Sequence, residues 1–77
     1  AKLHSMDQRD MPFVYDGLLK FKSDFTGEIQ MIDGLGRIIK TEMIHQIREY
    51  KIPQNALVVL LKSDQGKRGV LKLPLED

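Results

Sequence analysis

Few residues of this chain have a type and spacing that could carry out a reaction. Catalysis requires a nucleophile beside a base, a pair of carboxylates, or a metal ion with an open coordination position. His45 falls in a segment that we predict to be helical, where an exposed histidine is the ordinary finding. Asp33, Ser63 and Asp64 fall in predicted turns, where such side chains stabilise the backbone. We therefore expect no catalytic residues and no enzyme.

Binding sites for a metal ion or a cofactor are not predicted either. The chain has no cysteine and two histidines, which argues against disulfides, thiolate zinc sites and histidine-rich sites. Gly34-Leu35-Gly36 has the spacing that begins a dinucleotide-binding loop. That fingerprint, however, lies between a strand and a helix and has a third glycine, where this chain has Ile39.

The basic residues are the remaining candidates, because lysine and arginine can contact phosphates and give salt-dependent binding to nucleic acid. The formal net charge is +1, so such a site would need local clustering, reinforced by the symmetry of a dimer. The candidate DNA-contacting residues are Arg37, Lys40, Arg48 and Lys51. A second basic group consists of Lys62, Lys67, Arg68 and Lys72. An ordinary solvated face is the competing interpretation for either group.

The length of 77 residues corresponds to one small domain with a modest core. Such chains usually need disulfides, a metal or oligomerisation for stability, and here only oligomerisation is left open. We therefore predict a homodimer. No apolar run approaches the ~20 residues of a membrane span and no signal peptide opens the chain, so we expect no membrane partner and a cytoplasmic location.

The domain that positions these residues is predicted to be β-rich and to cover residues 17–77. Residues 1–16 lack periodicity and are predicted to form a flexible arm, of which residues 12–15 could pack on the core in extended form. The residues before Met6 resemble a cloning remnant.

A hairpin is predicted at the centre of the sequence. Residues 18–22 favour a short strand, and alternation over residues 25–32 predicts a half-buried one. Asp33-Gly34 predicts a two-residue type I′ turn, after which residues 35–39 return antiparallel. The face predicted to be shared along the second strand consists of Phe25, Gly27, Ile29 and Met31.

A short helix is predicted to follow this hairpin. Thr41 is a good N-cap, and Pro53 would end the helix. An apolar stripe at helical spacing consists of Met43, Ile44, Ile47 and Tyr50 or Lys51.

Two further strands complete the predicted fold. The apolar run of residues 56–61 favours a strand buried on both faces, and residues 68–73 form the last strand. The order is then ββ-α-ββ. We predict an α+β fold that is mostly β, with one short helix and a possible extra N-terminal strand.

The segments Thr26-Gly27 and Ile32-Asp33-Gly34-Leu35-Gly36-Arg37-Ile38 resemble AbrB/SpoVT-type domains, which also occur in MazE-like antitoxins. The resemblance covers residues 26–73. It implies a swapped-hairpin barrel, an intertwined dimer and DNA-binding transcription regulation. Lys40-Thr41 replaces the Ile-Pro or Val-Pro that usually opens the family's helix, and Gln30 and Met31 occupy positions where the family is basic.

Three functional hypotheses follow. The first is a dimeric AbrB-like regulator that contacts the phosphates of double-stranded DNA. The alternative is a non-enzymatic protein-interaction or assembly module without nucleic-acid binding, which the near-neutral charge, Gln30 and Met31 favour. The third is a small barrel of OB or SH3 type for single-stranded nucleic acid, but its base-stacking aromatic residues are missing.

Overall fold

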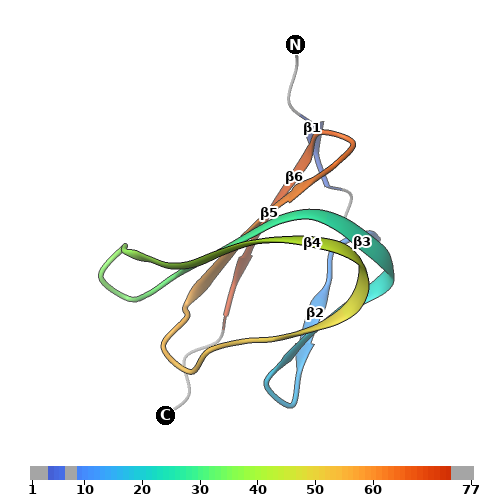
Figure 1. The fold of residues 1–77 in the computed structure, drawn as a ribbon. Helices are drawn as coiled ribbons and strands as arrows, with labels where there is room; N and C mark the ends of the chain where they lie inside the picture. Colours follow the sequence, from blue (N-terminus) through green and yellow to red (C-terminus); the bar gives the residue numbers. More distant parts are fainter. Residues whose placement is uncertain (1–3, 7–8, 74–77) are drawn as a thin grey trace.

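The computed structural model describes residues 4–6 and 9–73, which form a six-stranded sheet (Figure 1). The strands are β1 (His4–Ser5), β2 (Phe13–Tyr15), β3 (Leu18–Ile32), β4 (Ile38–Lys51), β5 (Val58–Ser63) and β6 (Lys67–Lys72). Their order is β1-β6-β5-β3-β2, and β4 pairs with β3. Pairing is antiparallel throughout, except that β1 runs parallel to β6.

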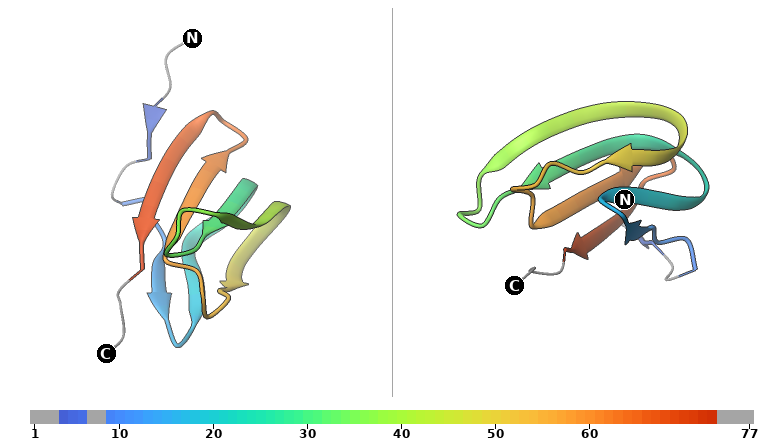
Figure 2. Two further views of the ribbon diagram at one scale, coloured as in Figure 1. Left: turned by 90° about the vertical axis from the view of Figure 1, so that its left-hand side faces the viewer. Right: turned by 90° about the horizontal axis from the view of Figure 1, so that it is seen from below.

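The central strand is β3, which is long enough to pair with three other strands. One edge of β3 pairs with β4, from Leu18–Lys51 to Ile32–Ile38. Its other edge pairs with β2 near Leu19 and with β5 from Gly27 onward. The register with β4 shifts where β3 passes from one neighbour to the other. Because such irregularities bend strands, β3 and β4 curl together into a half-barrel (Figure 2).

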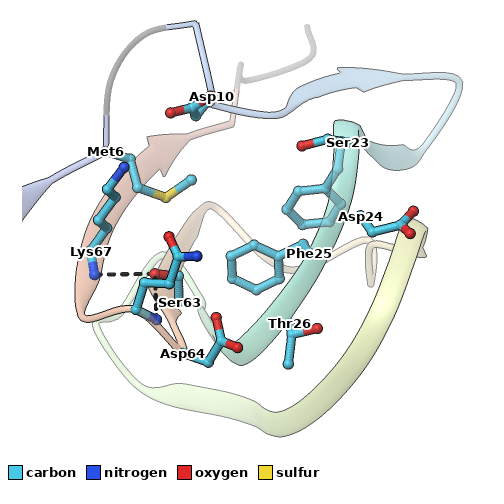
Figure 3. A pocket seen from close by; sticks show the side chains of 11 residues that line it. Met6, Asp10, Ser23, Asp24, Phe25, Thr26, Ser63, Asp64 and Lys67 are labelled. Atoms are coloured by element: carbon cyan, nitrogen blue, oxygen red, sulfur yellow. Dashed lines mark hydrogen bonds between the residues drawn. The ribbon is translucent and has the colours of Figure 1, made fainter.

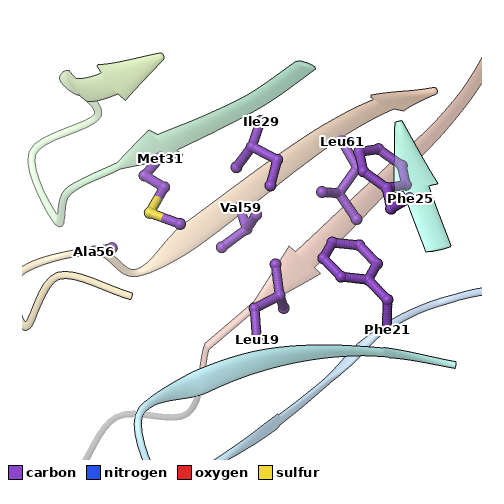
Figure 4. Close-up of a cluster of buried hydrophobic side chains, with 8 residues drawn as sticks. All are labelled: Leu19, Phe21, Phe25, Ile29, Met31, Ala56, Val59 and Leu61. Atoms are coloured by element: carbon purple, nitrogen blue, oxygen red, sulfur yellow. The ribbon is translucent and has the colours of Figure 1, made fainter. Parts of the chain in front are cut away.

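The hydrophobic core lies inside this curl (Figure 4). The predicted face of β3 is confirmed, because its four residues are buried and the residues between them are partly exposed. Both halves of β3 contribute side chains to the core, and β5 adds Val59 and Leu61. Val58 and Leu60 are partly exposed, so β5 is buried on one face only. The buried apolar residues are Leu19, Phe21, Phe25, Ile29, Met31, Ala56, Val59 and Leu61.

The predicted helix is wrong, and with it the α+β fold class. The segment is strand β4, and Thr41, the predicted helix cap, pairs with Gln30. The helix-like spacing has another origin. Gln46 adopts a φ of 50° at a register irregularity, and its amide donates to Thr26 Oγ1 at 3.0 Å. Because an extra residue in a strand resets the alternation of faces, residues three apart can share one face, as Ile44 and Ile47 do.

Three other local predictions change in detail. The strands predicted at residues 18–22 and 25–32 are parts of one continuous strand, β3. The turn after β3 lies where Asp33-Gly34 predicted it, but it is a longer loop over residues 33–37 in which the positive φ belongs to Gly36. Within the segment predicted as an arm, Phe13–Tyr15 form β2 on the β3 edge.

Candidate functional site

The β3–β4 loop positions the first predicted DNA-contacting residue, Arg37. The carboxylate of Asp33 organises this loop: its Oδ1 accepts hydrogen bonds from the amides of Leu35 and Arg37, each at 2.9 Å. Its Oδ2 accepts one from Arg37 Nε at 3.0 Å. Asp33 is only 8% exposed, so the guanidinium of Arg37 supplies the counter-charge of a nearly buried carboxylate.

The ionisation of Asp33 is tuned by the same contacts. The amide of Arg37 is the main cause that lowers the pKa of Asp33, burial opposes it, and the Leu35 amide and the Arg37 guanidinium lower the pKa further. The carboxylate form is therefore favoured by folding. The ionised carboxylate of Asp33 is part of the loop's structure, and the amide and guanidinium of Arg37 are both hydrogen-bonded to it.

We expect the Asp33→Asn variant to lack the part of the stability that the ionised Asp33 carboxylate contributes, which the wild type itself loses in acid. Because the folded-state pKa lies below the ordinary 3.8, the contribution of the carboxylate is complete above about pH 5 and is lost as the pH falls through the folded pKa. At pH 7 the variant should melt on the order of 5 °C lower than the wild type. Thermal melts between about pH 2 and 7 test this, since the two curves should converge in acid.

The matched control is Asp64→Asn in the exposed β5–β6 turn, which should retain the wild-type acid dependence. Parallel curves for wild type and Asp33→Asn down to the acid end would contradict the role assigned to Asp33.

Lys40, the second predicted residue, belongs to a cluster on β4. Its Nζ lies 3.6 Å from Glu42 Oε1 and 5.3 Å from the ring centroid of Tyr50. The hydroxyl of Tyr50 donates to Glu42 Oε1 at 2.5 Å. Glu42 and Tyr50 are eight positions apart on one strand, and β4 is strongly curved between its ends (Figure 1).

The three groups of this cluster shift one another's ionisation. The hydrogen bond with Tyr50 is the main cause that raises the pKa of Lys40 and lowers the pKa of Glu42. Burial, followed by the bond to Glu42, raises the pKa of Tyr50. Each shift favours the ammonium, carboxylate and neutral phenol forms near neutral pH. Lys40 is thus engaged with a carboxylate and an aromatic ring.

The remaining two predicted residues lie toward the end of β4. Arg48 Nε is 3.2 Å from Asp24 Oδ1, and Lys51 is exposed opposite Leu18. The structure therefore brings all four predicted residues to one strand and its loop. Three of them each have a carboxylate partner, which reduces the positive potential available to a phosphate backbone.

The second basic group divides between two surfaces. Lys62 and Arg68 are paired neighbours on β5 and β6, and Lys62 is also opposite Glu28 of β3. They line a shallow groove of about 260 Å³ on the outer face of the sheet, together with Gln30, Leu60 and Val70 among others.

Lys67 instead lines a cavity of about 230 Å³ at one end of the curl (Figure 3). The Phe21 and Phe25 rings stack there with centroids 4.8 Å apart. Ser63 Oγ accepts hydrogen bonds from the amides of Gln65 and Lys67. Carboxylates and hydroxyls surround the opening, but among the described residues no group of three or more His, Cys, Asp or Glu is placed to hold a metal ion.

An open sheet edge is the feature that sequence reasoning missed. Within the described part of the chain, β4 has β3 as its strand partner and its other edge is unpaired. The side chain of Met43 is 73% exposed and that of Ile38 is 58% exposed. The segment was predicted as a helix, so its backbone was expected to satisfy its own hydrogen bonds. The β-branched residues of this segment were the available signal for a strand.

The backbone directions along this edge follow from the register. The amide of Asp33 donates across the hairpin to the carbonyl of Arg37 at 2.9 Å, so the odd-numbered residues near this end of β3 face β4. Their partners on β4 are Lys40, Glu42 and Ile44. Since directions alternate along a strand, Thr41 and Met43 point their N–H and C=O groups to the open edge.

Comparison with known proteins identifies no relative. No family model, curated protein or solved structure matches this chain. The described residues also contain no helix that is long and apolar enough to cross a membrane.

Proposed function

We propose that this chain is a non-enzymatic protein-interaction module, which binds a partner by adding an extended strand to the open edge of β4. The observation that carries this proposal is the edge of β4 that has no strand partner among the described residues, where the N–H and C=O groups of Thr41 and Met43 point outward. Such groups are a template for another strand, because main-chain hydrogen bonds supply affinity without requiring a particular sequence.

The accepting segment is residues 40–44, which lie between the register irregularity near Ile39 and the one at Gln46. Beyond it, the irregularity at Gln46 turns the backbone out of line, which is a common way to protect a sheet edge. The exposed side chains of Ile38, at the start of β4, and of Met43, within the accepting segment, offer apolar surface for alternate side chains of an added strand.

Binding of double-stranded DNA is the competing function, because the four predicted basic residues share β4 and its loop. The carboxylates beside Arg37, Lys40 and Arg48 argue against it. Counterion release requires positive charges that are free to neutralise phosphates, and these cations are already partly neutralised.

Proline at Thr41 tests the proposal. Thr41→Pro removes an amide that points to the open edge and leaves the ladder to β3 with its donors, so the domain should fold. The probe is a phage-displayed library of unconstrained linear peptides. Peptides selected on the wild type should bind Thr41→Pro at least about tenfold more weakly than Thr41→Val, which keeps the amide. Hydrogen exchange should show protection of the Thr41 and Met43 amides on binding.

Two results would overturn the proposal. Selected peptides that bind Thr41→Pro and Thr41→Val equally would place recognition elsewhere on the molecule. Binding of a short DNA duplex at low salt, weakened by Arg37→Ala and by added salt, would support the DNA-binding function instead.

A further inference from the structure

We infer that the β4 edge accepts a second copy of this chain, with the two β4 strands antiparallel about a twofold axis through Thr41. The inference rests on the proposed function, because it uses the same edge and names its occupant. Lys40-Thr41-Glu42 is complementary to itself when reversed, and the register of β4 on β3 points the backbone groups of Thr41 to the open edge.

The segment around Thr41 is complementary to itself when reversed. A twofold axis at Thr41 places Lys40 opposite Glu42 of the second copy, and Glu42 opposite its Lys40. Ile39 lies at the register irregularity near the start of β4 and packs against the core, so it takes no part in this pairing. Opposite charges are a cross-strand combination that stabilises antiparallel pairs.

Other centres within this segment do not give these pairs. Residues directly opposite each other in a sheet share a face. A twofold axis between two copies of β4 must therefore place one residue opposite its own copy, and that residue is the centre of the pairing. An axis at Lys40 places that lysine opposite itself, and an axis at Glu42 does the same for the glutamate. An axis at Met43 places Glu42 opposite Ile44. Of these centres, only Thr41 places residues of opposite charge opposite each other.

The backbone directions agree with the same centre. Because Thr41 points its N–H and C=O to the open edge, two copies can exchange a pair of N–H···O=C bonds at the axis. Lys40 and Glu42 then form the pairs between hydrogen bonds, whose side chains approach most closely, with Cα atoms about 4.5 Å apart. The Lys40–Glu42 distance of 3.6 Å within one chain shows that both charged groups lie on the same side of β4.

The resulting dimer is isologous and joins the two sheets into one. A single pair of short strands buries less than the roughly 1,200–2,000 Å² of stable interfaces, so the association should be weak. We expect a dissociation constant between about 10 µM and 1 mM, which sets the concentrations for the experiment.

Charge reversal tests the register. Sedimentation velocity over about 10 µM to 1 mM should show a dimer for the wild type, while Lys40→Glu and Glu42→Lys should each dimerise at least about tenfold more weakly, because each places like charges opposite at two symmetric positions. An equimolar mixture of the two variants should form a heterodimer, since both pairs are then of opposite sign. The double variant K40E/E42K should dimerise like the wild type. Far-ultraviolet circular dichroism of each variant verifies folding.

The outcomes separate this inference from the proposed function. A wild type that stays monomeric to about 1 mM, yet binds selected peptides through Thr41, overturns the homodimer and leaves the strand-addition function standing. A dimer that Thr41→Pro and the charge reversals leave unchanged overturns the inference, because another face then forms the interface. A mixture of K40E and E42K that does not associate, while the wild type does, overturns the register.

Discussion

Replacing Gly27 with alanine is expected to destabilise the domain by about 3 kcal/mol, near the top of the usual range for a point substitution. A Cβ atom at this position would lie 2.2 Å from the carbonyl oxygen of Lys62 and 2.8 Å from the Cα of Ser63. Both contacts are backbone atoms of β5, so no side-chain rotation can relieve them. The strands must separate, which weakens the ladder that joins β3 to β5.

The measurement is urea unfolding at 25 °C, with Gly66→Ala as the matched control. Gly66 has a φ of 86°, and a Cβ there would meet nothing within 4 Å. The control should therefore lose only the ~1–2 kcal/mol of left-handed backbone strain. If the two variants unfold with free energies within about 0.5 kcal/mol, crowding at Gly27 is not the cause.

The Phe25→Ala variant is expected to lose about 3–5 kcal/mol of the free energy of unfolding. Phe25 is 6% exposed and stacks on Phe21 at an interplanar angle of 12°. Its ring lies beside Phe21 and Leu61 in the core (Figure 4). Alanine leaves a cavity and removes the aromatic pair. Typical stabilities of ~0.05–0.15 kcal/mol per residue give only about 4–12 kcal/mol for a chain of 77 residues, so this variant approaches full unfolding.

Phe13→Ala is the matched control, because Phe13 is 48% exposed on β2. Its unfolding free energy should change by about 0.5 kcal/mol or less. Chemical denaturation of both variants, followed by circular dichroism, measures the difference. Equal losses for the two phenylalanines would show that burial inside the curl does not set the stability.

Several elements could be predicted because they depend on local patterns. The alternation from Phe25 to Met31 requires a strand with one buried face, and the structure has it. Asp33-Gly34 marks a reversal of the chain, and the β5–β6 hairpin follows from two apolar segments around a polar turn. Each of these signals lies within about ten neighbouring residues, over which strand periodicity and turn chemistry operate.

The candidate site was predictable in composition but not in arrangement. The basic residues Arg37, Lys40 and Arg48 are visible in the sequence, and they do share one strand and its loop. Their carboxylate partners depend on the fold. Asp24 reaches Arg48 because β3 and β4 lie side by side, and Tyr50 reaches Glu42 because β4 curls. The sequence does not specify these long-range distances.

The sequence by itself determined that the chain reverses at Asp33-Gly34, which face of β3 is buried from Phe25 to Met31, and that the chain is nearly neutral in charge. The tertiary structure decided the state of residues 41–51. Their local spacing is compatible with an amphipathic helix, and helix propensity is a weak preference that packing can override. The second edge of β3 needed hydrogen-bond partners, and Ile44, Ile47 and Tyr50 could pack against the core from a bulged strand. Forming β4 satisfied the edge of β3 and left the far edge of β4 without a strand partner in the part of the chain that the structure describes.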